Sequence, residues 1–281
     1  MTKTEYSTHT VSDRTDAFIR KQTGPWYAYA APYAPHAPFN PEKKYANMAV
    51  SPWFGNPAVR ETDKSDKPPN VRRATGTLAE AQYVRRQQIR SLQSVYDMRD
   101  RLIATLRERG ELDNTLIFYL PDNGFQWSEH GLELKSMPYD SSVRVGAYVR
   151  GPGFTGGTDH RLVANIDVLP TVLAAAGVAY NKTQIDGRRL QTSHRTAILL
   201  EYWGNVRGWA PWASIRTPGM QYTEWYRADG SIKFKEYYNM VKDPWQLENR
   251  FLDGVSNNIP NRSTLHDQLS RKRVCVGGGC P

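Results

Sequence analysis

The sequence NTLIFYLPDNG, residues 114–124, does most to decide the fold. Its apolar part, Leu116 to Leu120, is a nearly continuous hydrophobic run of strand length with polar residues on both sides. Such a run suits an inner strand that helices cover on both faces. Asp122 and Asn123 follow where this strand would end, and ligands bind at the carboxyl ends of strands in α/β sheets. The stretch therefore predicts a buried strand with a candidate site at its end.

Helices and strands are expected to alternate on either side of this run. The spacing of apolar residues predicts, in chain order, a helix over 10–22, a strand over 26–31, a helix over 78–109, a strand over 145–149 and a helix over 167–176. This alternation is typical of a layered α/β domain.

The pattern changes after about residue 191. Short apolar segments bounded by turn residues predict strands over 197–202, 212–216, 221–227 and 232–238, followed by a helix over 263–273. The expected organisation is an α/β core over residues 1–190, with a long polar excursion at about 42–77, and a small, mainly antiparallel α+β subdomain over residues 191–281.

The composition fits a globular protein. Of 281 residues, 39% are hydrophobic and 23% are charged, which excludes collagen-like, coiled-coil and wholly disordered chains. No apolar stretch is long enough to span a bilayer as a helix, and residues 1–6 lead into polar sequence rather than a signal peptide. The net charge of +9 favours an anionic partner, but charge alone does not choose between nucleic acid, acidic polysaccharide and a small substrate. Because no nucleic-acid-binding motif is found, we expect no nucleic-acid partner.

The two cysteines, Cys275 and Cys280, lie close together in a glycine-rich tail. This spacing favours a small disulfide loop over a zinc site, which needs more ligands. A disulfide points to an oxidising compartment, whereas a signal peptide is not seen, so the compartment stays open.

Three short segments carry residues that could take part in chemistry. Asp122 and Asn123 offer the oxygen ligands that a hard cation such as calcium prefers, although the same residues often form a simple turn. His36 lies in the proline-rich sequence APHAP, and His130 is followed five residues later by Lys135. Each residue, taken singly, also fits an ordinary solvated surface.

In combination, these segments resemble the sulfatases of the alkaline-phosphatase-like superfamily. Residues 113–124 resemble the family's second calcium motif, and residues 34–38 resemble its sulfate-binding histidine segment. The order of the family also continues through four further stretches, namely 129–135, 144–153, 165–171 and 184–188. Residues 181–187 are especially similar to the glucosamine-6-sulfatase branch, and the resemblance extends from about residue 10 to about residue 252.

The resemblance implies an alkaline-phosphatase-like layered α/β/α core, incomplete in this chain, and hydrolysis of aryl or sugar sulfate esters. By that resemblance, His36 and Lys135 would bind sulfate oxygens, and one of them would steady or protonate the departing alcohol. His130 would also lie near the substrate. Asp122 and Asn123 would bind calcium through their side-chain oxygens.

The sequence departs from the family in two respects. It contains no Cys-x-Pro-Ser-Arg motif for the formylglycine nucleophile, and no Asp-Asp pair for the rest of the calcium shell. We therefore expect only a partial, weak calcium site and no hydrolysis by this chain alone. We also expect unpaired edges on the 116–120 and 26–31 strands, which a complementary N-terminal sulfatase segment would cover.

Two other functions stay open. One is a non-catalytic pseudoenzyme that binds sulfated or other anionic glycans. The other is a phosphate-ester hydrolase, against which the lack of a second metal-ligand cluster argues. The resemblance and the cysteine pair suggest a secreted, periplasmic or lysosomal location for a full-length parent.

Overall fold

A computed structural model describes residues 5–204, 208–255, 257–278 and 280. The chain divides into two compact units. The first comprises Met1–Phe54, Thr77–Ile117 and Arg150–Pro152, and the second comprises Gly55–Gly76, Phe118–Val149 and Gly153–Pro281. The domain boundary that the sequence suggests after residue 190 falls inside the second unit. The prediction about a signal peptide concerns residues 1–6, and of these residues 1–4 lie outside the described residues.

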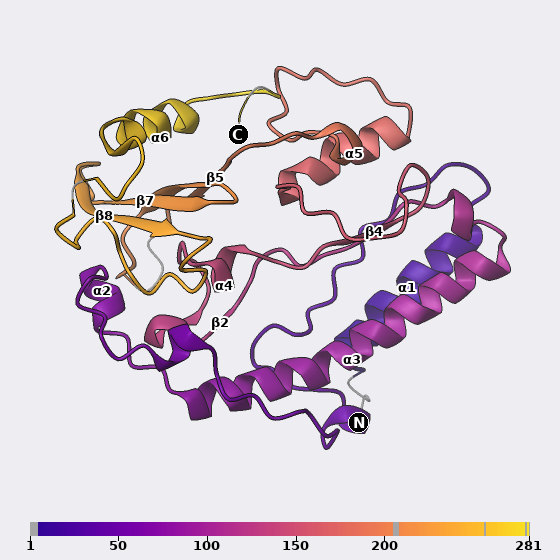
Figure 1. Ribbon diagram of the computed structural model, residues 1–281. Helices are drawn as coiled ribbons and strands as arrows, with labels where there is room; N and C mark the ends of the chain where they lie inside the picture. The colour runs from indigo at the N-terminus through magenta and orange to yellow at the C-terminus, as the bar shows by residue number, and fades with distance from the viewer. Residues whose placement is uncertain (1–4, 205–207, 256, 279, 281) are drawn as a thin grey trace. The chain divides into compact units, whose positions relative to one another are not determined.

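Two helices dominate the first unit. Helices α1 (Ser7–Lys21) and α3 (Leu78–Glu108) lie side by side (Figure 1) and confirm the helices predicted over 10–22 and 78–109. Their contact is largely polar. The carboxylate of Asp16 on α1 accepts hydrogen bonds from two side chains of α3, from Thr105 Oγ1 at 2.5 Å and from Arg101 Nη2 at 3.1 Å.

Residues 26–33 run in an extended conformation, but the strand predicted over 26–31 is wrong. A strand needs a ladder partner for its main-chain groups, and in the described chain no segment forms a ladder with these residues. Every second side chain faces outward, so Tyr27, Tyr29 and Tyr33 are 64%, 80% and 57% exposed. The apolar pattern of residues 26–31 is typical of a strand, but the described chain provides no partner strand for this segment.

Two small sheets carry the strands around the candidate site. Strand β1 (Ile117–Tyr119) pairs with β4 (Tyr148–Arg150), and β2 (Gln126–Trp127) pairs antiparallel with β3 (Glu133–Leu134). Strands β1 and β4 confirm that strands form around residues 116–120 and 145–149. The prediction that the first of them is a buried inner strand is wrong, because β1 is half-buried and has a single partner strand among the described residues. Helix α5 (Val168–Ala175) confirms the helix expected after them.

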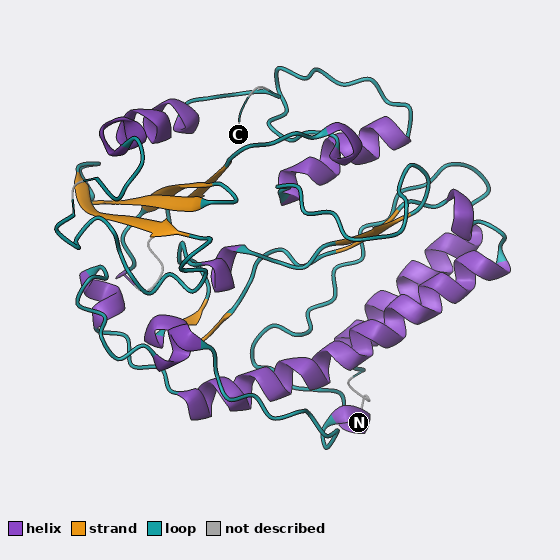
Figure 2. Cartoon of the chain, in the orientation of Figure 1, coloured by secondary structure: helices purple, strands orange, loops and turns teal. Residues whose placement is uncertain are grey.

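A four-stranded antiparallel sheet forms the centre of the second unit (Figure 2). Its strands follow one another in the order β5-β6-β7-β8 and span Ile198–Tyr202, Trp212–Arg216, Met220–Tyr226 and Ile232–Asn239. These strands confirm the four that the sequence predicts after residue 191. Helix α6 (Leu265–Arg273) confirms the closing helix.

Both faces of this sheet are buried. On one face, Leu265 and Leu269 of α6 pack against sheet residues that include Ile215 and Tyr222. On the other face, the sheet packs against residues from outside it, namely Val71, Leu132, Met137 and Tyr139. Successive side chains of these strands point alternately into the two cores. Because both cores must be filled, the strands are rich in large aromatic residues.

The remaining helices are short. They are η1 (Lys43–Tyr45), η2 (Pro57–Arg60), α2 (Pro69–Arg72), η3 (Leu112–Asn114), η4 (Glu129–Gly131), α4 (Asp140–Val143), η5 (Asn165–Asp167), η6 (Leu190–Thr192) and η8 (Arg262–Thr264). No helix in the described ranges combines the length and apolar character needed to cross a membrane.

A group of buried polar side chains, here called the buried network, lies beneath the second face of the sheet. Its members are Glu61, Lys67, His130, Tyr139, Trp225, Glu236 and Tyr238. Glu236 accepts hydrogen bonds from the hydroxyls of Tyr139 at 2.9 Å and Tyr238 at 2.6 Å, and from Trp225 Nε1 at 2.6 Å. Burial raises the pKa of the Glu236 carboxyl, and these three donors oppose that rise.

The polar excursion around residues 42–77 contributes to this network. Lys67 is 0% exposed, and its Nζ lies 3.1 Å from Glu61 Oε1, 2.8 Å from Asp66 Oδ1 and 2.7 Å from the carbonyl oxygen of Leu247. A buried ammonium is tolerated when it is surrounded by such partners. Part of the excursion is therefore integral to the core of the second unit.

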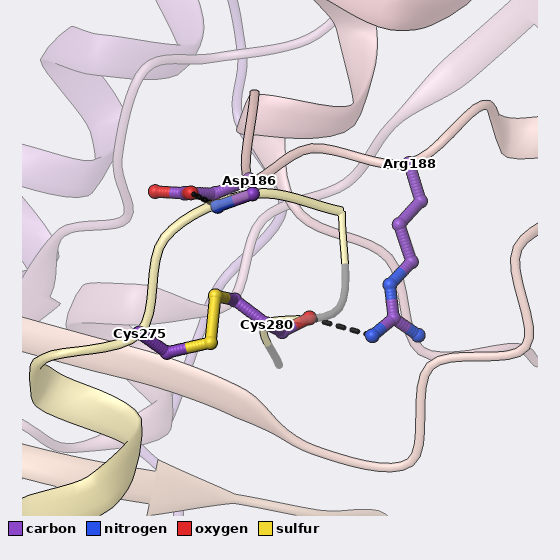
Figure 3. Close-up of a disulfide and its surroundings, with 5 residues drawn as sticks. Asp186, Arg188, Cys275 and Cys280 are labelled. Carbon is purple, nitrogen blue, oxygen red and sulfur yellow. Dashed lines mark hydrogen bonds between the residues drawn. A yellow bond between two sulfur atoms is a disulfide. The ribbon is translucent and has the colours of Figure 1, made fainter. Parts of the chain in front are cut away.

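The C-terminal cysteines form the predicted disulfide, between Cys275 and Cys280 (Figure 3). The loop that it closes contacts the segment around Asp186. The main-chain N–H of Gly277 donates to Asp186 Oδ1 at 2.6 Å, and Arg188 Nη2 donates to the carbonyl oxygen of Cys280 at 2.6 Å. The tail is thus fastened to the 182–188 loop by hydrogen bonds as well as by packing.

Candidate functional site

The turn after β1 presents the two predicted metal ligands. Asp122 is exposed, and its Oδ1 accepts a hydrogen bond from the main-chain N–H of Asn123 at 3.0 Å. The N–H of Gly124 donates to the carbonyl oxygen of Ser142 at 2.9 Å. Any side chain at position 124 would meet the main chain, because an added Cβ would lie 2.2 Å from the carbonyl oxygen of Ser141. Glycine is therefore required for the turn to pack this closely.

Lys135 lies beside this turn. Its Nζ donates to Asn123 Oδ1 at 2.9 Å, although the two residues are twelve positions apart along the chain. We call Asp122, Asn123 and Lys135 the strand-end cluster. The cluster combines a carboxylate, an amide and an ammonium at the end of a strand, where its side chains are accessible or half-buried.

The backbone on both sides of Lys135 is strained. Leu134 has φ 72° and Ser136 has φ 80°, and neither is a glycine. Ser128 and His130, earlier in the same β2–β3 hairpin, also have positive φ. Such conformations are costly for residues with a side chain, and they gather at functional sites, where strain fixes a side chain in place. The hairpin thus sets the direction of Lys135.

His130 lies in the buried network. Its side chain is 1% exposed, its Nδ1 is 2.7 Å from Glu61 Oε2, and its ring packs against Tyr139 at 4.3 Å between centroids. Lys64 Nζ donates to the carbonyl oxygen of His130 at 3.3 Å. Burial lowers the pKa of the Lys64 ammonium. These contacts hold the hairpin against the buried network. They also leave the His130 side chain almost inaccessible to a ligand.

His36 lies in the first unit, in the proline-rich loop that the sequence singles out. The side chain is exposed. Its Nδ1 is 3.1 Å from the hydroxyl of Tyr33 and 3.1 Å from the carbonyl oxygen of Ala37. When Nδ1 carries the proton that Ala37 accepts, Nε2 is an acceptor; when both nitrogens are protonated, Nε2 is a donor.

The strand-end cluster fits a hard cation in the type of its donors. Asp122 and Asn123 provide oxygen ligands, whereas calcium takes six to eight oxygens, so two side chains make part of a shell. Among the described residues, no group of three or more His, Cys, Asp or Glu side chains is arranged to hold a metal ion.

Asn165 is a residue at this site that sequence reasoning did not single out. It lies on η5, and its side-chain Nδ2 donates to the carbonyl oxygen of Asp122 at 3.0 Å. In the sequence, Asn165 is simply the first residue of the stretch 165–171, which resembles the sulfatase family. A hydrogen bond to a main-chain carbonyl leaves no signature in residue types, so only the structure could reveal it.

Comparison of the sequence with protein-family models identifies the family of this chain. The sulfatase family model matches residues 1–178, more than half of the chain. The chain is a member of the sulfatase family. The match includes His36 and every residue of the strand-end cluster.

Curated relatives agree with this membership. The sulfatase chain is 30% identical over 278 residues to N-acetylglucosamine-6-sulfatase of Capra hircus, covering 82% of this chain and 49% of the relative. It is 27% identical to an arylsulfatase of Volvox carteri, covering 98% of this chain and 52% of the relative. The chain thus spans about half the length of the curated relatives that it matches.

Solved structures support the alkaline-phosphatase-like α/β fold. A structure solved in complex with its substrate, D-glucosamine-2-N,6-O-disulfate, is similar with a TM-score of 0.77 and 21% identity. That similarity covers 95% of this sulfatase chain and 69% of the other chain. At this level of identity the likeness concerns the fold.

Proposed function

We propose that this sulfatase chain provides the sulfate-binding part of a sulfuric ester hydrolase that acts on sulfated sugars. The observation that carries the proposal is the contact of Lys135 Nζ with Asn123 Oδ1 at 2.9 Å, at the end of β1. It joins a cation to a candidate metal ligand at the edge where α/β sheets bind substrates. The sugar class is supported by the similarity to N-acetylglucosamine-6-sulfatase.

In this proposal, Lys135 binds sulfate oxygens through its N–H donors, and the family resemblance implies the same role for His36. As the ester bond breaks, its electron pair moves to the leaving oxygen, and preplaced donors stabilise the charge that develops there. One of the two residues donates a proton to that oxygen, so the product leaves as a neutral alcohol. His130 contributes indirectly, by holding the hairpin that carries Lys135.

Asp122 and Asn123 would hold calcium, which would polarise the sulfuryl group when bound. Two oxygens leave most of the calcium shell to be supplied by other groups, so we expect binding weaker than micromolar by this chain. The exposed position of Asp122 leaves it open to such additional ligands.

We further propose that a complementary N-terminal sulfatase segment supplies the formylglycine nucleophile, since this sequence holds no motif for it. The extended residues 26–33 provide an unpaired edge with three exposed tyrosines on which such a segment could add a strand. By itself, the chain should bind a sulfated sugar without releasing sulfate.

The test is a titration of the 281-residue chain with N-acetylglucosamine 6-sulfate, and with N-acetylglucosamine as the matched ligand without sulfate. Binding of the sulfated sugar alone, weakened by salt and lost in Lys135→Met, is the expected result. Lys182→Met, at an exposed lysine outside the cluster, serves as the control. Equal binding by Lys135→Met and wild type would refute the proposal.

The same titration separates the two other functions. Tight binding of long anionic glycans, with no release of sulfate after a complementary segment has been added, would favour the glycan-binding pseudoenzyme. Preference for a sugar phosphate over the sulfate would favour the phosphate-ester hydrolase.

A further inference from the structure

We infer that Asn165 is a positioning residue for the turn that carries Asp122 and Asn123, an inference that rests on the proposed function of that turn. Asn165 Nδ2 lies 3.0 Å from the carbonyl oxygen of Asp122 and 3.4 Å from that of Pro121. A side-chain amide has two N–H donors, so it can serve both carbonyls at once.

These two bonds fix the peptide groups immediately before the proposed ligands. The far side of the turn is held by the hydrogen bond between Gly124 N–H and the carbonyl oxygen of Ser142, at 2.9 Å. Asn165 therefore provides the matching restraint at the near side. With both ends held, the Asp122 carboxylate leaves the main chain in a defined direction.

Asn165 lies on η5, a segment that hydrogen bonds to a buried side chain hold in place. Asp167, at the other end of η5, accepts hydrogen bonds from Ala164 N–H at 2.9 Å, Arg188 N–H at 2.7 Å and Arg195 Nη2 at 2.5 Å. The side chains of Asp167 and Arg195 are both 0% exposed. Losing one partner of such a buried pair is strongly unfavourable, so η5 is held in one conformation.

The exposure of Asn165 indicates that its role is orientation rather than stability. Asn165 lies at the surface, where water can replace its hydrogen bonds to the two carbonyls at little net cost. A contact that adds little to folding but fixes the orientation of a ligand group is the usual role of residues that surround a metal site.

The test uses the full chain with Asn165→Ala and three readouts. We expect the ¹³C resonances of the Pro121 and Asp122 carbonyls to shift, because mobile water takes the place of the fixed amide donor of Asn165. Calorimetric affinity for calcium chloride should fall about ten- to a hundredfold. The thermal midpoint should stay unchanged. Asn181→Ala is the control, because Asn181 is an exposed asparagine whose side chain bonds within its own turn, to Thr183.

The readouts distinguish this inference from the proposed function. If wild type binds no calcium, the metal proposal fails, and the two carbonyl resonances still decide whether Asn165 holds the turn. Unshifted resonances would overturn the inference. A fall in calcium affinity that accompanies an equal loss of thermal stability would also overturn it, because that result describes a structural residue. Asn165→Asp, which keeps the shape but lacks the donor, should reproduce the carbonyl shifts of Asn165→Ala.

Discussion

The buried network and the strand-end cluster lie in the same unit and use the same kinds of side chain, but their surroundings differ. Lys67 is 0% exposed and surrounded by oxygens of Glu61, Asp66 and Leu247. Lys135 is half-buried, and within the described part of the chain its Nζ has one hydrogen-bond partner, Asn123. The first lysine has its donors used within the protein, whereas the second keeps donors for a ligand.

This difference shows how polar residues of similar appearance divide between folding and function. A buried charge must be paired or the fold is lost, so the network has no capacity left for a substrate. An exposed cluster adds little to stability and can be tuned for binding. The predictions below challenge that division, beginning with the largest expected effect.

Replacing Lys67 with methionine should destabilise the protein most. The change leaves Glu61 and Asp66 without their buried cation, and breaking such a pair costs about 3–5 kcal/mol. Urea unfolding would measure the loss. Lys135→Met is the matched control and should lie within about 0.5 kcal/mol of wild type. Equal losses of stability in Lys67→Met and Lys135→Met would contradict the distinction between the buried network and the strand-end cluster.

Glu236→Gln should destabilise by about 1–3 kcal/mol, since the new amide nitrogen cannot accept the hydrogen bond of Trp225. The size of the loss should also depend on pH. Burial raises the folded-state pKa of Glu236 above 4.5, so its contribution is fully present below about pH 4.5 and is lost as pH rises through the folded-state pKa.

The stability advantage of wild type over Glu236→Gln should therefore shrink from pH 4 to pH 8 in urea unfolding. Comparing the two proteins at each pH cancels the titration of the other carboxylates. An advantage that grows with pH would show that Glu236 is better stabilised as the charged form, contrary to this account.

Asp122→Asn should weaken calcium binding about tenfold, or about 1.4 kcal/mol, because it removes the charge of the strand-end cluster's carboxylate. The free energy of unfolding should not change, since Asp122 is exposed. Calorimetry and urea unfolding of the same preparation would check both statements. A large loss of stability would place Asp122 with the buried network instead.

The smallest effect is expected from the C-terminal disulfide. Replacing Cys275 and Cys280 with serine should speed hydrogen exchange in residues 182–188, which the tail contacts through the main-chain groups of Gly277 and Cys280. The sheet should keep its protection, because its two cores do not include the tail. Faster exchange throughout the sheet would show that the tail supports more than its own loop.

Local patterns were sufficient to predict much of the fold. The four strands of the large sheet and helices α1, α3, α5 and α6 follow from spacing, because the side chains of each alternate or recur on a buried face. The segment 26–31 has the same apolar character, but a strand exists only with a partner. The burial of Lys67 depends on residue 247, far along the chain, and no local pattern could predict it.

The candidate site was predictable in its residues rather than in its arrangement. Asp122, Asn123 and Lys135 were identified by resemblance, and the structure places them together. His130 was identified in the same way, yet its burial against Glu61 is a tertiary property. Asn165 was found only from its contact with main-chain oxygens.

The central claim is that the strand-end cluster binds the sulfate group. A crystal of this chain soaked with selenate, which has the shape and charge of sulfate and scatters X-rays anomalously, tests it directly. The account predicts an anomalous peak within hydrogen-bonding distance of Lys135 Nζ, absent in Lys135→Met. A peak only at other basic residues, with none at Lys135, would contradict it.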